Sequence, residues 1–135
     1  MLPSGPIPSF PNTTGLQNGA NLNKLSQLIG SYQPDVVARA GGTKAAATQI
    51  TAAAVEVATC ATNDDSVILP PGYPGLEVAI WNRGAATLRV FGSGTDTINA
   101  VATATGVTQA TGVSAIYKCV NVAAGVGEWM RVLSA

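Results

Sequence analysis

From Thr43 onward, hydrophobic and polar positions alternate in short runs that are separated by turn-forming residues. The stretch AAATQITAAAVEVATC is rich in alanine, but its β-branched residues and the alternation in VEVAT favour strands over a helix. TNDDS and PPGYPG predict turns on either side of the short strand SVILP. The whole pattern predicts about seven or eight short strands, which is typical of a mainly β, antiparallel sandwich or jelly-roll-like domain over residues 43–135.

The run LEVAIWNRGAATLRVF predicts a hairpin that specifies its own register. With the turn centred on Gly84, Ile80 lies opposite Leu88. Val78 then lies opposite Val90, so the apolar side chains share one face. The other face carries the remaining residues of the two strands, namely Glu77, Ala79, Trp81, Arg89 and Phe91. A second hairpin is expected from VSAIYKCVNV and EWMRVLSA, where two registers fit the pattern equally.

Residues 1–42 follow a different pattern, and we interpret them as an attachment arm. MLPSGPIPSFP holds four of the eight prolines of the chain. Proline fixes φ and lacks an amide donor, so this segment is expected to be extended. Two interpretations are open: a disordered tail, or an arm that becomes ordered on a partner. In the second case its apolar and proline residues would make the contact: Leu2, Pro3, Pro6, Ile7, Pro8, Phe10 and Pro11.

Leucines recur at intervals of three and four residues in NGANLNKLSQLIGSY, which predicts a short amphipathic helix over about residues 19–30. Its apolar face consists of Leu22, Leu25, Leu28 and Ile29. Gly30 can end the helix in the left-handed conformation. A helix of this length is not stable alone, so its apolar face must be buried against its own domain or against a partner. The sequence does not choose between the two.

Composition narrows the classes of function. The 135-residue chain has seven basic and seven acidic residues, and charged residues make up 10% of it, against about 25% in an average protein. It therefore lacks the basic stripe that nucleic acid or an anionic membrane would require, and we expect neither as a partner. The chain contains no histidine, which excludes Ser-His-Asp and Cys-His sites. We expect no enzymatic activity and no cofactor.

Several acidic residues are candidates for metal binding or catalysis. Asp64 and Asp65 could contribute to a calcium site, but two neighbouring carboxylates are too few ligands, and a turn is the better interpretation. Asp96 could act with Glu77 or Glu128, but no spacing supports a catalytic pair, and a turn-entry aspartate is favoured.

The four large aromatic residues of the predicted strands allow two interpretations. They could form a platform for stacking sugars, or they could supply the bulk of a core that is otherwise made of small residues, which we favour. These residues are Trp81, Phe91, Tyr117 and Trp129. Cys60 and Cys119 both fall in predicted strands and are expected to be buried thiols, although a bridge between them is not excluded.

Three segments carry a resemblance to a known class of proteins: DSVILPPGYPGLEVAIWNRGAATLRVFGSGTDTINAVA, GVSAIYKC and GEWMRVL. From about Ala45 to its C-terminus, the chain resembles a module of small virion proteins of tailed bacteriophages. The resemblance implies a β-sandwich on the capsid surface of the virion, which decorates and stabilises the shell as a cement or head-fibre protein.

The same resemblance implies two partners: the major capsid protein, and further copies of the chain in a homotrimer. In this interpretation the N-terminal arm and the predicted helix grip the capsid or a neighbouring subunit. The alternative is a tail-associated or adhesin-type module that binds host surface glycans through Trp81 or Trp129.

Overall fold

The structure is a computed structural model that describes residues 30–135. The predicted contact residues of the arm, from Leu2 to Pro11, lie outside the described residues. The predicted helix over about residues 19–30 also lies outside them, apart from Gly30, whose φ of 70° is in the left-handed region.

The described residues are mainly β, as the alternation predicted. A short 3-10 turn, η1 (Lys44–Ala46), lies between the first two strands. The strands are β1 (Tyr32–Val37), β2 (Thr48–Gln49), β3 (Ala54–Thr59), β4 (Ser66–Ile68), β5 (Glu77–Asn82), β6 (Leu88–Phe91), β7 (Thr97–Ile98), β8 (Val107–Gln109), β9 (Ser114–Ala123) and β10 (Val126–Leu133). The sheet begins at Tyr32 and not at Thr43, because β1 lies within the segment predicted to be the arm.

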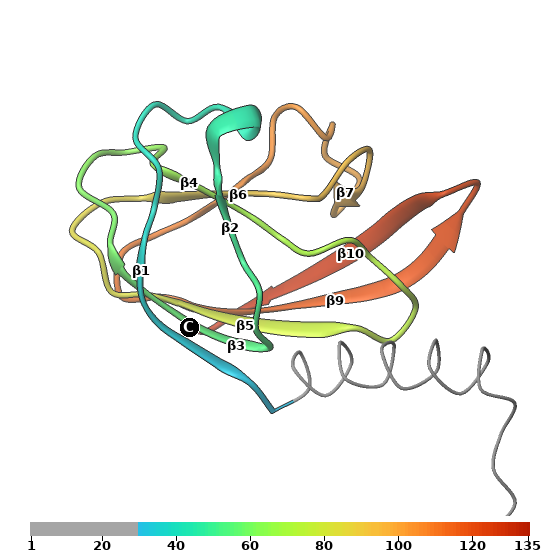
Figure 1. The fold of residues 1–135 in the computed structure, drawn as a ribbon, viewed down its shortest axis with the longest axis horizontal. Coiled ribbons are helices and arrows are strands. Elements are labelled where there is room, and N and C mark those ends of the chain that lie inside the picture. Colours follow the sequence, from blue (N-terminus) through green and yellow to red (C-terminus); the bar gives the residue numbers. More distant parts are fainter. Residues whose placement is uncertain (1–29) are drawn as a thin grey trace, which may run out of the picture.

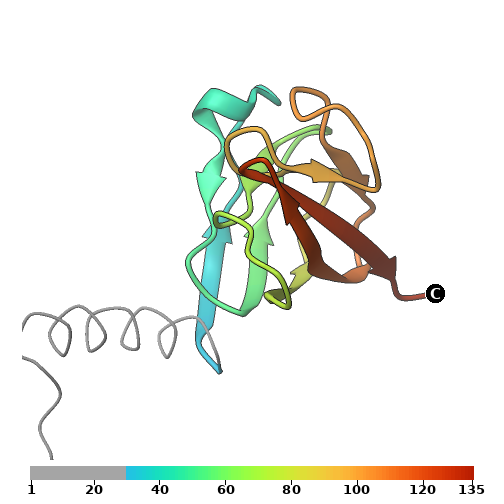
Figure 2. The ribbon, with the colours of Figure 1, turned by 90° about the vertical axis from the view of Figure 1, so that its right-hand side faces the viewer.

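The strands form two sheets that enclose the core (Figure 1). Sheet A has six strands in the order β1-β3-β5-β9-β10-β7, and sheet B has four in the order β2-β4-β6-β8. Figure 2 shows the start of β1, in blue, at the end of the domain opposite η1. The chain therefore enters the domain at one end of sheet A.

The prediction of an antiparallel sandwich was wrong in one respect, because both sheets are mixed. The chain alternates between the sheets through its first six strands, and each new strand lies parallel to the strand two before it. The antiparallel pairs are β5–β9, β9–β10 and β6–β8. The N-terminal part of the domain is thus wound in successive coils, and the C-terminal strands complete the two sheets.

The hairpin predicted around Gly84 was also wrong, because β5 and β6 belong to different sheets. Ile80 pairs with Val55 and Ala115, and not with Leu88. An inward-facing alternation has the same appearance whether two strands pair in one sheet or face each other across a core. The sequence pattern could therefore place Ile80 in the core without identifying its neighbours.

The chain crosses between the sheets at Asn82, which is fully buried. Its Nδ2 donates to the carbonyls of Ala86 and Gln109, and its Oδ1 accepts from the amide of Gly84. A Cβ added at Gly84 would lie 2.4 Å from backbone and side-chain atoms of Cys60. A glycine is required here because the crossing passes directly over the β3–β4 turn.

The C-terminal hairpin is confirmed, and the structure fixes its register. Ala123 pairs with Val126, and a two-residue turn at Ala124 and Gly125 connects the strands with φ values of 51° and 79°. Positive φ at both positions is characteristic of a type I′ turn, which matches the twist of paired strands. A bulge follows between Glu128 and Trp129.

A buried polar network lies in the core. The Tyr117 hydroxyl donates to Oε1 of Gln109, and Nε2 of Gln109 donates to the carbonyls of Ile80 and Val113. Burial raises the pKa of Tyr117. Among the described residues, no buried side-chain nitrogen or oxygen lacks a hydrogen-bond partner. The core therefore contains polar side chains as well as apolar ones, and every buried polar side chain among the described residues is hydrogen-bonded.

Candidate functional site

The most unusual surface of the described residues is the outward face of sheet A. The paired residues of five adjacent strands form one row across it: Tyr32, Ala54, Ala79, Ile116 and Val132. Every residue in the row is aromatic or aliphatic, whereas the outer face of a half-buried sheet usually carries polar residues. Exposed apolar surface of this kind marks a site of interaction.

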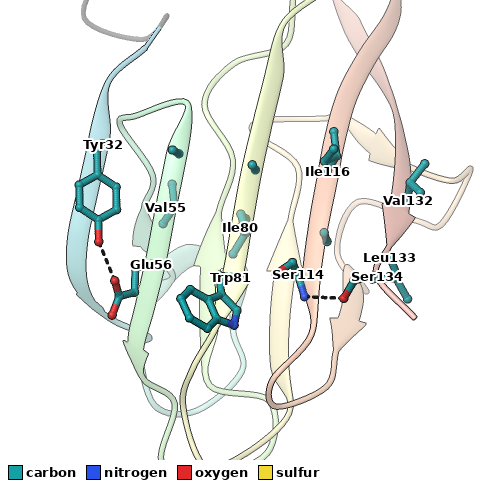
Figure 3. A pocket seen from close by; sticks show the side chains of 13 residues that line it. Tyr32, Val55, Glu56, Ile80, Trp81, Ser114, Ile116, Val132, Leu133 and Ser134 are labelled. Carbon is teal, nitrogen blue, oxygen red and sulfur yellow. Dashed lines mark hydrogen bonds between the residues drawn. The ribbon is translucent and has the colours of Figure 1, made fainter.

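This row crosses an open groove of about 560 Å³, which we call the outer groove (Figure 3). Ala54 and Ala79, on the central strands β3 and β5, form part of its floor because their side chains are short. Tyr32 stands on one side, and Ile116 and Val132 stand on the other. The groove is hollow because alanines lie between larger residues on the flanking strands.

A chain of polar contacts runs along one part of the outer groove. The Tyr32 hydroxyl donates to Glu56 over 2.6 Å, and Arg83 forms a 2.5 Å ion pair with the same carboxylate. The Arg83 guanidinium lies 4.8 Å from the centre of the Trp81 ring. The hydrogen bond from Tyr32 is the largest cause that lowers the pKa of Glu56, followed by that from Arg83, and the bond to Glu56 raises the pKa of Tyr32. The contacts hold Tyr32 and Trp81 in place as side chains of the groove.

The structure separates the four aromatic residues that the sequence grouped together. Phe91, Tyr117 and Trp129 are buried, which confirms the core interpretation for these three. Trp81 is 46% exposed in the outer groove, so the core interpretation was wrong for it. Because Trp129 is 2% exposed, it cannot serve as a stacking surface for glycans in this structure. Only Trp81 keeps that possibility.

The Asp96 carboxylate joins separate segments of the chain through hydrogen bonds. Its side chain is buried, with Oδ2 accepting from the amide of Gly72 and from Nε1 of Trp129. Its Oδ1 accepts from the amide of Gly127 over 2.7 Å. A Cβ added at Gly72 or Gly127 would lie within 3.0 Å of the Asp96 carboxylate. One carboxylate thereby ties together three chain segments.

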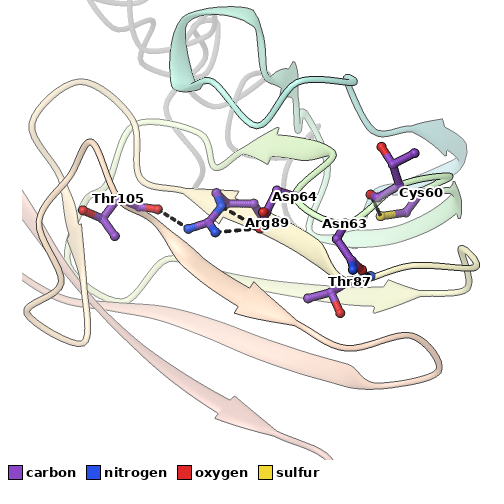
Figure 4. Close-up of polar contacts among 7 residues, drawn as sticks. Cys60, Asn63, Asp64, Thr87, Arg89 and Thr105 are labelled. Carbon is purple, nitrogen blue, oxygen red and sulfur yellow. Dashed lines mark hydrogen bonds and ion pairs between the residues drawn. The ribbon is translucent and has the colours of Figure 1, made fainter.

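Asp64 and Asp65 lie in a turn, as predicted, and each is engaged in holding it. Asp65 accepts from the amides of Ala61 and Thr62 and from the Thr62 hydroxyl. Figure 4 shows Arg89 donating from Nε and Nη2 to Asp64. Glu77, which the predicted hairpin placed on the same face as Arg89, instead pairs in register with Lys118. Among residues 30–135, no group of three or more acidic or cysteine side chains is arranged to hold a metal.

Both cysteines are free and buried, as predicted. Burial is the largest cause that raises the pKa of Cys60, to about 11, and burial also raises that of Cys119. A thiol that stays protonated is a poor nucleophile. The two cysteines therefore act as small core residues.

A comparison with protein-family models and with curated proteins found no match for this chain. Within the part of the chain that the structure describes, no helix is long and apolar enough to cross a membrane. The site therefore has to be interpreted from its own geometry.

The outer groove was not recognised from the sequence, although a signal for it exists. In VSAIYKCVNV, Ile116 and Val120 share the outward parity with Lys118, and in EWMRVLSA the outward Met130 and Val132 are also apolar. A strand with apolar residues on both parities indicates two buried faces. Aligning these residues with Tyr32, however, required the observed strand order.

Proposed function

We propose that the chain is a non-enzymatic structural protein of a tailed-phage virion. It decorates and stabilises the capsid surface as a cement or head-fibre protein, and it assembles as a homotrimer. The apolar and proline residues from Leu2 to Pro11 contact the major capsid protein. The β-domain provides the body that these arms link together.

One observation carries this proposal: residues by which the sequence resembles phage virion modules also hold the fold together. Asp96 belongs to the DTIN motif, and its carboxylate binds Gly127 and Trp129 of the GEWMRVL motif. It also accepts from Gly72 of the preceding PPG turn. Motifs that meet in one buried joint are constraints on architecture, which supports a shared fold with a structural role.

The outer face of sheet A supports association as the mode of action. Val120 and Met130 are exposed on this face outside the lining of the outer groove. Apolar patches on a protein surface mark contacts with other proteins. Linking several arms through one oligomer multiplies avidity for a lattice without any new contact at each arm.

The proposal is tested by binding to purified shells of the parent phage. The full chain is compared with a variant in which Leu2, Ile7 and Phe10 are replaced by serine. The matched control replaces Asn12, Thr13 and Thr14 by serine. Co-sedimentation should fall by at least about tenfold for the apolar variant and stay unchanged for the control, because avidity multiplies each lost contact. Full occupancy by the apolar variant would contradict the anchoring role.

A second candidate function is favoured by the exposure of Trp81. A tail-associated or adhesin-type module would stack a host glycan on this ring, with Glu56 nearby as a hydrogen-bond acceptor. Binding to a glycan array that is lost in Trp81→Ala but kept in Val120→Ala would favour this candidate. Absence of glycan binding by the full chain would remove it.

A further inference from the structure

The outer groove is open and its lining is mainly apolar. The first described residues of the chain lie at its edge. Only Gly30 and Ser31 separate Ile29 from Tyr32, which is one side of the groove. Ser31 is fixed beside the groove floor: its Oγ accepts from the amide of Ala53, and its carbonyl accepts from the amide of Ala54. The segment before Gly30 is therefore tethered next to the groove by an anchored linker of two residues.

We propose that the apolar face of the segment 19–29, made of Leu22, Leu25, Leu28 and Ile29, packs into the outer groove of its own molecule. The sequence requires this face to be buried against something, because a helix of this length is unstable in water by itself. The apolar row on the outer face of sheet A is likewise left uncovered by residues 30–135, so it would also gain from being buried.

The dimensions of the groove fit one helix. Tyr32 on β1 and Ile116 on β9 are separated by three strand spacings, which is about 14 Å. An α-helix with its side chains is about 10–12 Å in diameter. The alanines at positions 54 and 79 leave the depth between the two sides that leucine side chains would fill.

The tether favours the molecule's own segment over a second copy. A short linker gives the segment an effective concentration in the millimolar range at the groove. A second copy must reach the groove from dilute solution. The inference replaces the expectation that the predicted helix grips the capsid or a neighbouring subunit. It does not depend on the proposed function, in which residues 2–11 make the capsid contact. With segment 19–29 in the outer groove, Val120 and Met130 would stay exposed for contacts between copies, because neither residue lines the groove.

Cross-linking of the full chain tests the inference. Leu25→Cys and Ala79→Cys are introduced together and treated with a short bismaleimide. The matched control pairs Asn23→Cys with Ala79→Cys, since Asn23 lies on the opposite side of the predicted helix. The native thiols Cys60 and Cys119 are buried and have raised pKa values, so they compete little.

The expected result is an intramolecular product that forms at least about tenfold faster for the Leu25 pair than for the Asn23 pair. Equal rates for the two pairs would mean random collision and would overturn the inference. Products between chains, visible as covalent dimers on a denaturing gel, would also overturn it and would assign the groove to a neighbouring copy.

A second measurement requires no cross-link. Acrylamide quenching of Trp81 is compared in the full chain, in Leu25→Asp/Leu28→Asp and in the charge-matched control Asn23→Asp/Gln27→Glu. Trp129 is buried and contributes a small, constant term. Quenching should rise about twofold or more only in the leucine variant, because the apolar face is then lost. Unchanged quenching in that variant would contradict the inference.

Discussion

Both faces of sheet A carry large apolar side chains, yet only the inner face is fully buried as a core. On the inner face, Ile80 and Tyr117 are buried, and the hydroxyl of Tyr117 is satisfied by Gln109. On the outer face, Trp81 and Ile116 are almost half exposed, at 46% and 45%. The difference teaches that apolar residues alone do not define an interior. In a finished core, the polar groups that are buried among the apolar side chains also form hydrogen bonds.

The largest expected effect on the free energy of unfolding comes from removing the Asp96 carboxylate, which joins separate segments on the inner side of sheet A. Asp96→Ala removes the acceptor of the amides of Gly72 and Gly127 and of the Trp129 indole. Leaving two buried donors and one half-buried donor unpaired should lower the free energy of unfolding by about 3–5 kcal/mol. Urea unfolding measures this, with Glu77→Gln on the outer face as the control. A loss below about 1 kcal/mol would show that the joint does not hold the fold.

Two isoleucines on adjacent strands compare the faces directly. Ile80 on β5 is 1% exposed and Ile116 on β9 is 45% exposed. Ile80→Ala should cost about 3 kcal/mol, because it leaves a cavity in the core. In the Leu25→Asp/Leu28→Asp background, where segment 19–29 would no longer cover the groove, Ile116→Ala should cost about 1 kcal/mol or less, because residues 30–135 cover its side chain only in part. Equal costs in thermal or urea unfolding would remove the distinction between the faces.

The contribution of the inner polar network is smaller and can be isolated. Tyr117→Phe keeps the ring but deletes the hydroxyl that donates to Gln109. The cost should be about 1 kcal/mol, the usual net value of one buried hydrogen bond, plus the desolvation left on the Gln109 oxygen. Tyr73→Phe, at a partly exposed position, is the matched control and should leave unfolding unchanged.

The smallest effect belongs to the polar contacts beside the outer groove. The pKa of Glu56 is lowered in the folded protein, so its contribution to stability is complete above its ordinary pKa and is lost as the pH falls through the folded pKa. In Glu56→Gln this acid-dependent part disappears. The stability difference between the variant and the unchanged chain should therefore be largest near neutral pH and shrink below about pH 4. A difference that is constant from pH 3 to 7 would contradict the assignment.

The sequence predicted which strand residues are buried better than it predicted which strands pair. The alternation correctly placed Val78 and Ile80 on one apolar face, and that face is buried. It could not reveal that β5 pairs with β3 and β9 and not with β6. The alternation of side chains shows which residues of a strand share a face, but it does not show which strand lies beside it.

Other predictions failed where burial came from distant segments. The predicted hairpin placed Phe91 on the opposite face from Leu88, yet both residues are buried, and a Cβ at Gly106 would lie within 3.0 Å of the Phe91 ring. Asp96 was predicted at the entry of a turn, but its amide donates to the carbonyl of Ser93, so it closes the preceding turn. The partners of its carboxylate come from segments far apart in the sequence. The outer groove was missed for the same reason, since its row joins residues from Tyr32 to Val132.

The two edge strands of sheet A are poorly suited to pairing with a strand of another copy. Edge strand β1 contains Pro34, which has no amide hydrogen to donate, and its pairing with β3 is interrupted by two register shifts. The opposite edge, β7, is only two residues long. Neither border offers a regular ladder to which a neighbouring strand could add. Copies of this domain that come into contact would therefore meet through side chains and would not extend sheet A into a continuous intermolecular sheet.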